Sequence, residues 1–197
     1  MRWTVLIFSA LLVQDPKPPD FLTLKEGTVW TYLTGGSEGK IKVTGREKIG
    51  EIETFILTTE IDGAATEKEF VAIDATGIRM LRQASGPSGE RVTDYAQPFV
   101  RLKLPPVKGD KWEWKGEIGK EKATAAFTNE GEEEVKVPAG TYKAWKVTVM
   151  IEQGAAKQTG ANWFAPGVGI VRQVAKFESE GRKHESVIEL KSFEPGK

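Results

Sequence analysis

The sequence offers few side chains that could carry out acid–base or nucleophilic chemistry. His184 is the only histidine and the chain has no cysteine, so a general base working near neutral pH would have to be His184. Its neighbours Arg182, Lys183 and Glu185 directly follow a turn signal, which is typical of an exposed hairpin residue. Ser88 lies in Gly-Pro-Ser-Gly, which is not a nucleophile-elbow pattern. We therefore predict no catalytic residue and no enzymatic activity.

The densest acidic run consists of Glu130, Glu132, Glu133 and Glu134. This run could bind a cation, but alternation along a strand puts Glu132 and Glu134 on one face and Glu133 on the other. We therefore predict a solvated strand edge at this run, with no metal site and no cofactor. The remaining enzymatic alternative is a hydrolase that uses carboxylates alone, which needs two of them facing each other about 5–9.5 Å apart.

Aromatic residues form the one group with two functional interpretations. Trp30 with Tyr32, and Trp112 with Trp114, each occupy positions i and i+2, so each pair shares one face of a strand. In the first interpretation these rings fill the interior of a curved sheet, because large aromatic side chains dominate core burial. In the second, some of them line a groove for an apolar or sugar ligand. Trp112 and Trp114 are the candidate ligand-binding residues.

β-Strands must position these side chains, because the chain after residue 20 shows almost no helical periodicity. Short alternating runs are separated by Gly, Asp, Asn and Pro, which is the pattern of antiparallel strands. About a dozen strands at spacings near ten residues predict an all-β fold, a strongly curved antiparallel sheet or open barrel. Strands are expected at 99–104 and 177–180, and a connection at 129–131 is expected between strands 123–128 and 132–137.

Two stretches resemble edited copies of each other. Ala75–Gln83 aligns without a gap on Ala165–Gln173, with identical residues at the Ala, Gly, Arg and Gln positions. We predict one β-domain over 21–197, built from sequence-related halves at about 21–93 and 103–193. The halves should superpose by a rotation near two-fold, which places Trp30 on Trp112, Phe55 on Trp145 and Arg82 on Arg172. Gly77 and Gly167 should occupy equivalent turns with positive φ.

Composition and charge exclude several classes of protein. The chain has 28 basic and 28 acidic residues, so it lacks the basic face that nucleic acid requires and gives no electrostatic reason to bind anionic membrane. Arg2 and the apolar run 3–13 predict a signal peptide over residues 1–14, followed by a Pro-rich lead-in at 15–20. We therefore expect export to the periplasm or the extracellular space. Without cysteine the chain has no site for lipid attachment, and we do not expect an integral membrane protein.

Three motifs carry a resemblance to a known group of proteins. They are Phe21-Leu22-Thr23-Leu24-x-x-Gly27-x-x-Trp30-x-Tyr32, Val135-Lys136-Val137-Pro138-Ala139-Gly140-Thr141-Tyr142 and Trp163-Phe164-Ala165-Pro166-Gly167-Val168-Gly169-Ile170-Val171. They resemble a bacterial family of exported, often lipoprotein-type β-domains of unknown function. The resemblance implies an open, strongly curved antiparallel barrel, similar to the lipoprotein-carrier half-barrels. It implies no catalytic residues and no agreed activity.

Together these observations predict a non-enzymatic, exported cell-envelope domain that binds an apolar ligand or a protein partner. The expected partners are a lipid or another envelope protein. The alternative is a carbohydrate-binding module that uses surface tryptophans, which needs two coplanar exposed indole rings beside polar side chains. The ligand and the oligomeric state are left open by the sequence.

Overall fold

The structure is a computed structural model that describes residues 21–22, 24–86, 89–179 and 181–197. The expected signal peptide and the Pro-rich lead-in lie outside the described residues. Within them every regular element is a β-strand, which confirms the all-β prediction. The strands are β1 (Val29–Thr34), β2 (Ser37–Ile49), β3 (Ile52–Ile61), β4 (Ala64–Asp74), β5 (Gly77–Ser85), β6 (Arg91–Lys103), β7 (Lys111–Ile118), β8 (Glu121–Val137), β9 (Gly140–Gln153), β10 (Ala156–Ala165), β11 (Gly169–Ser179) and β12 (Arg182–Glu194).

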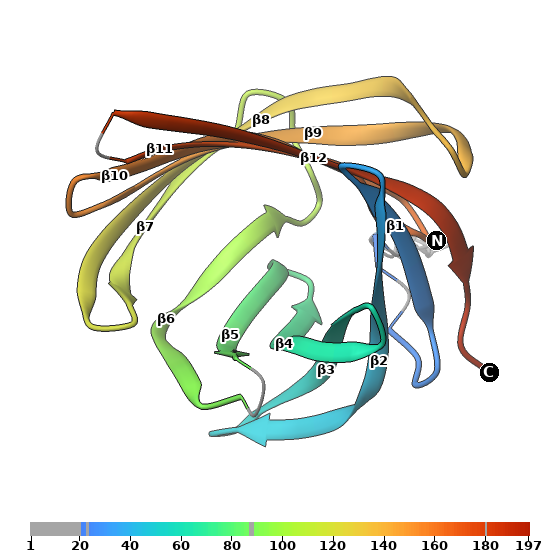
Figure 1. Cartoon of the computed structure of the whole chain (residues 1–197), viewed down its shortest axis with the longest axis horizontal. Helices are drawn as coiled ribbons and strands as arrows, with labels where there is room; N and C mark the ends of the chain where they lie inside the picture. Colours follow the sequence, from blue (N-terminus) through green and yellow to red (C-terminus); the bar gives the residue numbers. More distant parts are fainter. Residues whose placement is uncertain (1–20, 23, 87–88, 180) are drawn as a thin grey trace, which may run out of the picture.

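All twelve strands form one antiparallel sheet. The order in the sheet runs from β6 back to β1, crosses to β12, and continues from β12 back to β7. Each half of the chain is therefore a six-stranded meander, and the two meanders are joined by the pairing of β1 with β12. The sheet curls until its two end strands, β6 and β7, approach each other (Figure 1). The result is the nearly closed barrel that the sequence predicts.

The connection predicted at 129–131 is wrong, because β8 is one continuous strand of 17 residues. Its pairing with β9 shifts between Asn129 and Gly131, so this stretch is a β-bulge. Gly131 has a φ of 105°, and its N–H donates to Asn129 Oδ1 at 3.0 Å. Asn129 and Gly131 thus have the turn-like conformation that their residue types indicate. Because the pairing with β9 continues on both sides of them, β8 bends here and does not end.

Two irregularities of pairing fall at corresponding places in the two halves, whereas the shifts in the β3–β4 and β5–β6 ladders have no counterpart in the second half. The β2–β3 and β8–β9 ladders both shift near their middle. The β4–β5 ladder shifts beside the pair Phe70 and Arg82, and the β10–β11 ladder shifts beside the pair Trp163 and Arg172. In each pair the guanidinium lies over the ring, 5.3 Å from its centroid. Arg82 and Arg172 therefore have matching surroundings, while the superposition of the whole halves stays a prediction.

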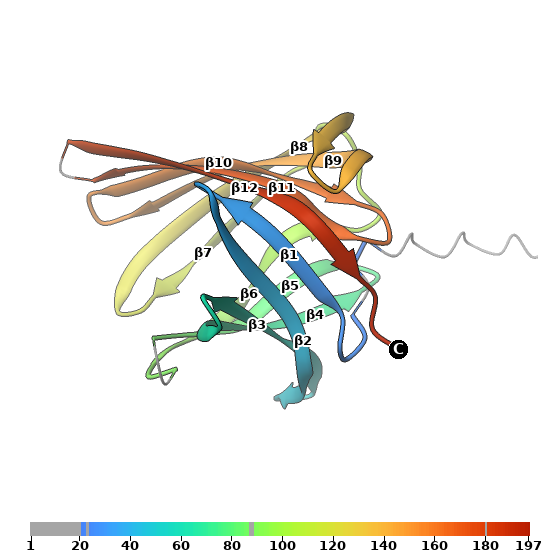
Figure 2. The ribbon, with the colours of Figure 1, turned by 45° about the vertical axis from the view of Figure 1, so that its right-hand side comes forward.

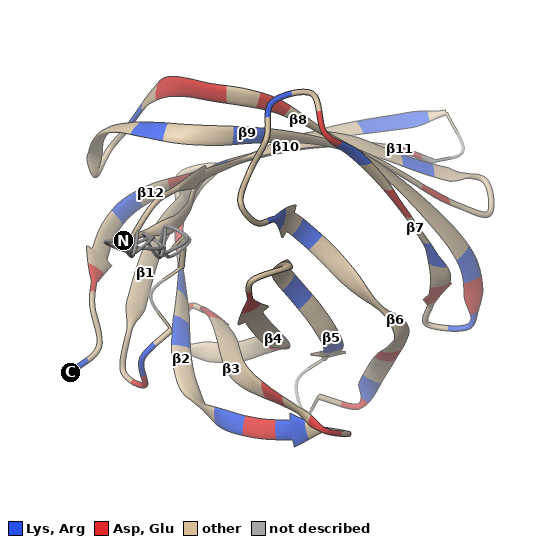
Figure 3. Cartoon of the chain, turned by 180° about the vertical axis from the view of Figure 1, so that it is seen from behind, with Lys and Arg blue, Asp and Glu red and all other residues tan. Residues whose placement is uncertain are grey.

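The end of the β8–β9 hairpin folds over the outside of the barrel (Figure 2). Ala139 N donates to Leu190 O of β12 at 2.9 Å, and Trp163 Nε1 of β10 donates to Glu133 Oε1 at 2.6 Å. The glutamates at 130 and 132–134 are exposed, and this part of β8 pairs with β9 alone, so it is the solvated strand edge that the sequence predicts. Elsewhere basic and acidic residues are interspersed over the sheet (Figure 3).

Gly77 and Gly167 both have positive φ, at 152° and 77°, which confirms the prediction for these two turns. A Cβ on Gly77 would lie 2.3 Å from Leu102 O on the neighbouring strand β6. Gly77→Ala is therefore expected to lower the free energy of unfolding by more than about 1 kcal/mol, measured by urea denaturation.

The matched control is Gly45→Ala. Gly45 lies on β2, its φ is not positive, and a Cβ there would meet no atom within 4 Å. This substitution should be neutral or slightly stabilising, because alanine loses less backbone entropy than glycine on folding. Equal effects of the two substitutions would contradict the steric explanation.

Candidate functional site

A cavity of about 50 Å³ lies inside the barrel, between the two halves of the chain. Trp30, Ile41 and Val71 line it from the first half, and Phe164 and Ile170 from the second. Its wall is apolar except at one place, where charged side chains from β4 and β6 reach it. The cavity has room for a few water molecules, whereas pockets for small ligands measure about 300–1,000 Å³.

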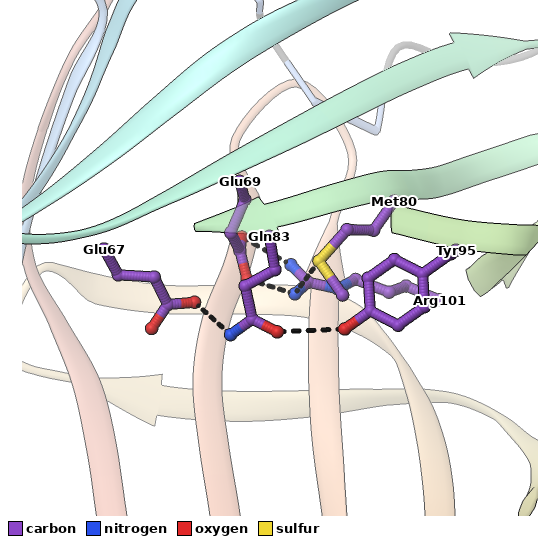
Figure 4. A network of polar contacts seen from close by, with 6 residues as sticks. All are labelled: Glu67, Glu69, Met80, Gln83, Tyr95 and Arg101. Atoms are coloured by element: carbon purple, nitrogen blue, oxygen red, sulfur yellow. Dashed lines mark hydrogen bonds and ion pairs between the residues drawn. The ribbon is translucent and has the colours of Figure 1, made fainter. Parts of the chain in front are cut away.

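The charged side chains at the cavity wall are Glu69 of β4 and Arg101 of β6. The guanidinium donates from two nitrogens to the two carboxylate oxygens, Nη1 to Oε2 at 2.9 Å and Nη2 to Oε1 (Figure 4). Arg101 Nη2 also lies 3.3 Å from the sulfur of Met80 on β5. Both ions are largely buried, and bidentate pairing is the geometry that best offsets the loss of hydration.

A second polar chain lies beside this ion pair. Gln83 Nε2 donates to Glu67 Oε1 at 2.7 Å, and Tyr95 O–H donates to Gln83 Oε1 at 2.9 Å (Figure 4). Glu67 and Glu69 are two residues apart on β4, so they share a face of the strand. The ion pair and this chain together form the interior polar cluster, which consists of Glu67, Glu69, Gln83, Tyr95 and Arg101.

The interior polar cluster contains two carboxylates and one guanidinium, so one negative charge has no partner. Burial, and then the charge of Glu69, raise the pKa of Glu67 above its ordinary value. Burial likewise raises the pKa of the Tyr95 hydroxyl to about 12. Burial opposes the charge on Arg101, but the carboxylate of Glu69 outweighs it and raises the pKa of Arg101. Arg101 therefore remains charged, and the pKa of the Glu67 carboxyl lies above its ordinary value.

The raised pKa of Glu67 makes stability depend on pH. Because the folded protein holds the Glu67 proton more tightly than the unfolded chain, stability falls as pH rises past the unfolded pKa of about 4.3 and through the folded pKa. Glu67→Gln removes this loss. The difference in free energy of unfolding, variant minus original, should therefore become more positive from about pH 4 to about pH 7.5. Urea denaturation at both pH values measures the change. Glu113→Gln, at an exposed carboxylate outside the cluster, is the control, and a pH-independent difference for Glu67→Gln would refute the prediction.

The structure places Trp112 and Trp114 at the seam, by which we mean the junction of β6 and β7, where no ladder joins the ends of the described sheet. Trp112 Nε1 donates to Val100 O at 2.9 Å and Trp114 Nε1 donates to Gln97 O at 2.7 Å, so both indoles bind backbone oxygens of β6. The two side chains are only 9% and 4% exposed. Side chains therefore close the barrel where backbone pairing stops. These residues lie in the hydrophobic core, and Trp30 is the tryptophan at the cavity.

The remaining candidates lie away from the cavity. His184 is exposed on β12, near its hairpin with β11. In the described part of the chain no three His, Asp or Glu side chains gather in a way that could hold a metal ion. Over the same residues, no helix is long and apolar enough to cross a membrane.

A family model described as DUF3108-like matches residues 118–186, about a third of the chain. Two of the three motifs that carry the resemblance, 135–142 and 163–171, lie inside this match. A search among curated protein sequences finds no match to the chain.

Solved structures resemble the fold over most of its length. A candidate exported protein from Bacteroides fragilis, described as having a YmcC-like fold, is 16% identical, with a TM-score of 0.53 over 89% of this chain and 99% of that chain. A candidate lipoprotein from Parabacteroides distasonis is 17% identical, with a TM-score of 0.49 over 90% and 100%. The hypothetical lipoprotein YmcC from Escherichia coli is 8% identical, with a TM-score of 0.36 over 87% and 86%.

The chain is thus an antiparallel β-barrel of YmcC-like architecture, on the strength of the Bacteroides fragilis structure. The family match and the Bacteroides fragilis structure confirm its resemblance to DUF3108-like and exported bacterial β-domains. At these identities the likeness concerns the fold.

Proposed function

We propose that this chain is a non-enzymatic, exported cell-envelope protein that binds an apolar ligand, of the kind a lipid chain provides, inside its barrel. The observation that carries the proposal is the apolar cavity between the two meanders, with its single charged corner. Pockets with mostly apolar walls and a few convergent polar groups are the usual form of a small-molecule site. The similarity in fold to a candidate exported protein supports the exported location.

A ligand must enlarge the cavity, and the seam is the place where this costs least backbone pairing. β6 and β7 can separate without breaking a ladder, because their described contacts include side-chain hydrogen bonds rather than strand pairing. A ligand entering there would pass Trp112 and Trp114, which gives these two residues a ligand-contacting role in the proposal. Sugar stacking on them has less support, since neither indole offers an exposed face.

The test uses the full chain, isolated gently from its native host. Native mass spectrometry should detect a co-purified lipid. A brominated dodecanol should quench the tryptophan fluorescence of delipidated protein in a saturable way, because Trp30 lines the cavity. Ile41→Phe, which fills the cavity, should weaken the quenching. Ile61→Phe, on an exposed part of β3, is the matched control. Absence of both lipid and saturable quenching would overturn the proposal.

A further inference from the structure

The charge balance of the interior polar cluster indicates which polar head groups of an amphiphilic ligand the cluster can bind. Among the described residues, no salt bridge reaches Glu67, whose oxygen Oε1 accepts a hydrogen bond from the neutral Gln83. Within the same set, Arg101 is the one guanidinium at the cavity wall, and it is already paired with both oxygens of Glu69. An anionic head would therefore have to displace Glu69 from Arg101 and would leave two carboxylates beside it without a partner.

A buried hydrogen-bond acceptor without a donor lies on β10, in the second half of the chain. Asn162 of β10 alternates with Trp163 and so shares the face of Phe164, which lines the cavity. Its Oδ1 is buried and has no hydrogen-bond partner. A buried acceptor without a donor is costly, and it gains from a ligand that supplies an N–H or O–H group.

Unsatisfied donors, by contrast, lie on the other side of the sheet. Arg79 Nε is buried without a partner, but Arg79 alternates with Ile78, which lines the cavity, so it faces away. Arg172 Nε forms no hydrogen bond but lies 3.4 Å from Glu189 Oε1 in an ion pair, and Arg172 pairs with Trp163, which alternates with Phe164. Among the described side chains, the one buried polar atom on the inner face without a hydrogen bond is therefore an acceptor, Asn162 Oδ1.

Resting on the proposed function, we infer that the ligand is an amphiphile with a cationic, hydrogen-bond-donating head, such as a protonated amine. Its head lies against Glu69 at the cavity wall and points toward Glu67, two residues away on the same face of β4. Its apolar chain lies along Ile41, Val71 and Phe164. The head supplies the positive charge that the interior polar cluster lacks, and Arg101 keeps its bond to Glu69. A fatty acid meets the same apolar wall but is repelled by the unpaired carboxylate.

Three probes with the same twelve-carbon alkyl group separate the contribution of the polar head from that of the alkyl group. They are dodecylamine, dodecanol and dodecanoate. Binding to the delipidated full chain is measured near pH 7 by isothermal titration below the micelle concentration. Dodecylamine should bind at least about tenfold more tightly than dodecanoate, since one charge-assisted hydrogen bond contributes about 1.5–3 kcal/mol. Glu67→Gln should reduce this ratio severalfold. Glu113→Gln, which removes a surface carboxylate, should leave the ratio as it is.

The outcomes separate two failures. If dodecanoate binds as tightly as dodecylamine, or if Glu113→Gln changes the ratio as much as Glu67→Gln does, the inference about the head is wrong while apolar binding stands. If none of the three probes binds, the proposed function itself fails.

Discussion

Trp114→Ala is expected to lower the free energy of unfolding by about 3–5 kcal/mol. The Trp114 ring meets Tyr95 and Phe99 of β6 edge-on, with centroids 5.7 Å and 5.2 Å away, and its N–H binds Gln97 O. The substitution removes a large buried ring and one of the indole bonds that hold the seam. Urea denaturation followed by circular dichroism measures the loss.

Trp114→Phe separates the two contributions of this side chain. Phenylalanine keeps most of the apolar ring but cannot donate to Gln97 O, so the expected loss is about 1–2 kcal/mol. Hydrogen exchange in β6 and β7 should rise for both variants, while exchange at the β1–β12 ladder should not. Uniform acceleration across the sheet would show that the indole stabilises the whole barrel and has no special role at the seam.

Arg101→Met should cost about 3–5 kcal/mol, because it leaves Glu67 and Glu69 buried beside each other without the guanidinium that neutralises them. Adding Glu69→Gln to Arg101→Met should recover a large part of this loss, because the second change removes a buried charge. Chemical denaturation of the original chain and the two variants near pH 7 provides the comparison.

Arg46→Met is the control for this series. Arg46 pairs with Glu53 at the surface, 3.6 Å apart, where both side chains are more than half exposed. Surface pairs contribute about 0–1 kcal/mol, so this substitution should have a small effect. If Arg101→Met is equally mild, or if Glu69→Gln adds to its cost, the guanidinium does not stabilise the barrel by neutralising the buried carboxylates.

The fold class follows from alternation in the sequence, but strand ends follow from tertiary context. A strand predicted at 99–104 begins eight residues earlier, at Arg91 of β6. Residues 91–94 pair with β5 on one side only, residues 95–98 lie in an irregularity of that ladder, and Val92 is exposed, so this stretch needs little of the apolar alternation that marks a strand. The strand predicted at 177–180 is the end of β11, in a polar hairpin with β12.

The candidate site is less accessible from sequence than the fold. Alternation places Arg101 and Leu102 on opposite faces of β6, but it does not say which of the two faces the cavity. A charged residue ordinarily indicates the face that is exposed to solvent. Glu67 and Glu69 give the same signal on β4. Register shifts in the β4–β5 and β5–β6 ladders then decide which side chains meet, and no residue type specifies those shifts.

The pairing of β1 with β12 affects how the barrel is made. β1 is the first of the described strands to be synthesised, whereas β12, which pairs with its other edge, is the last of them. Until then β1 presents a bare edge with Trp30 and Tyr32 on it, a surface that invites pairing with other chains. Closing so long a loop is slow compared with forming hairpins. The strand at the centre of the finished sheet therefore keeps one edge unpaired until β12 has been made.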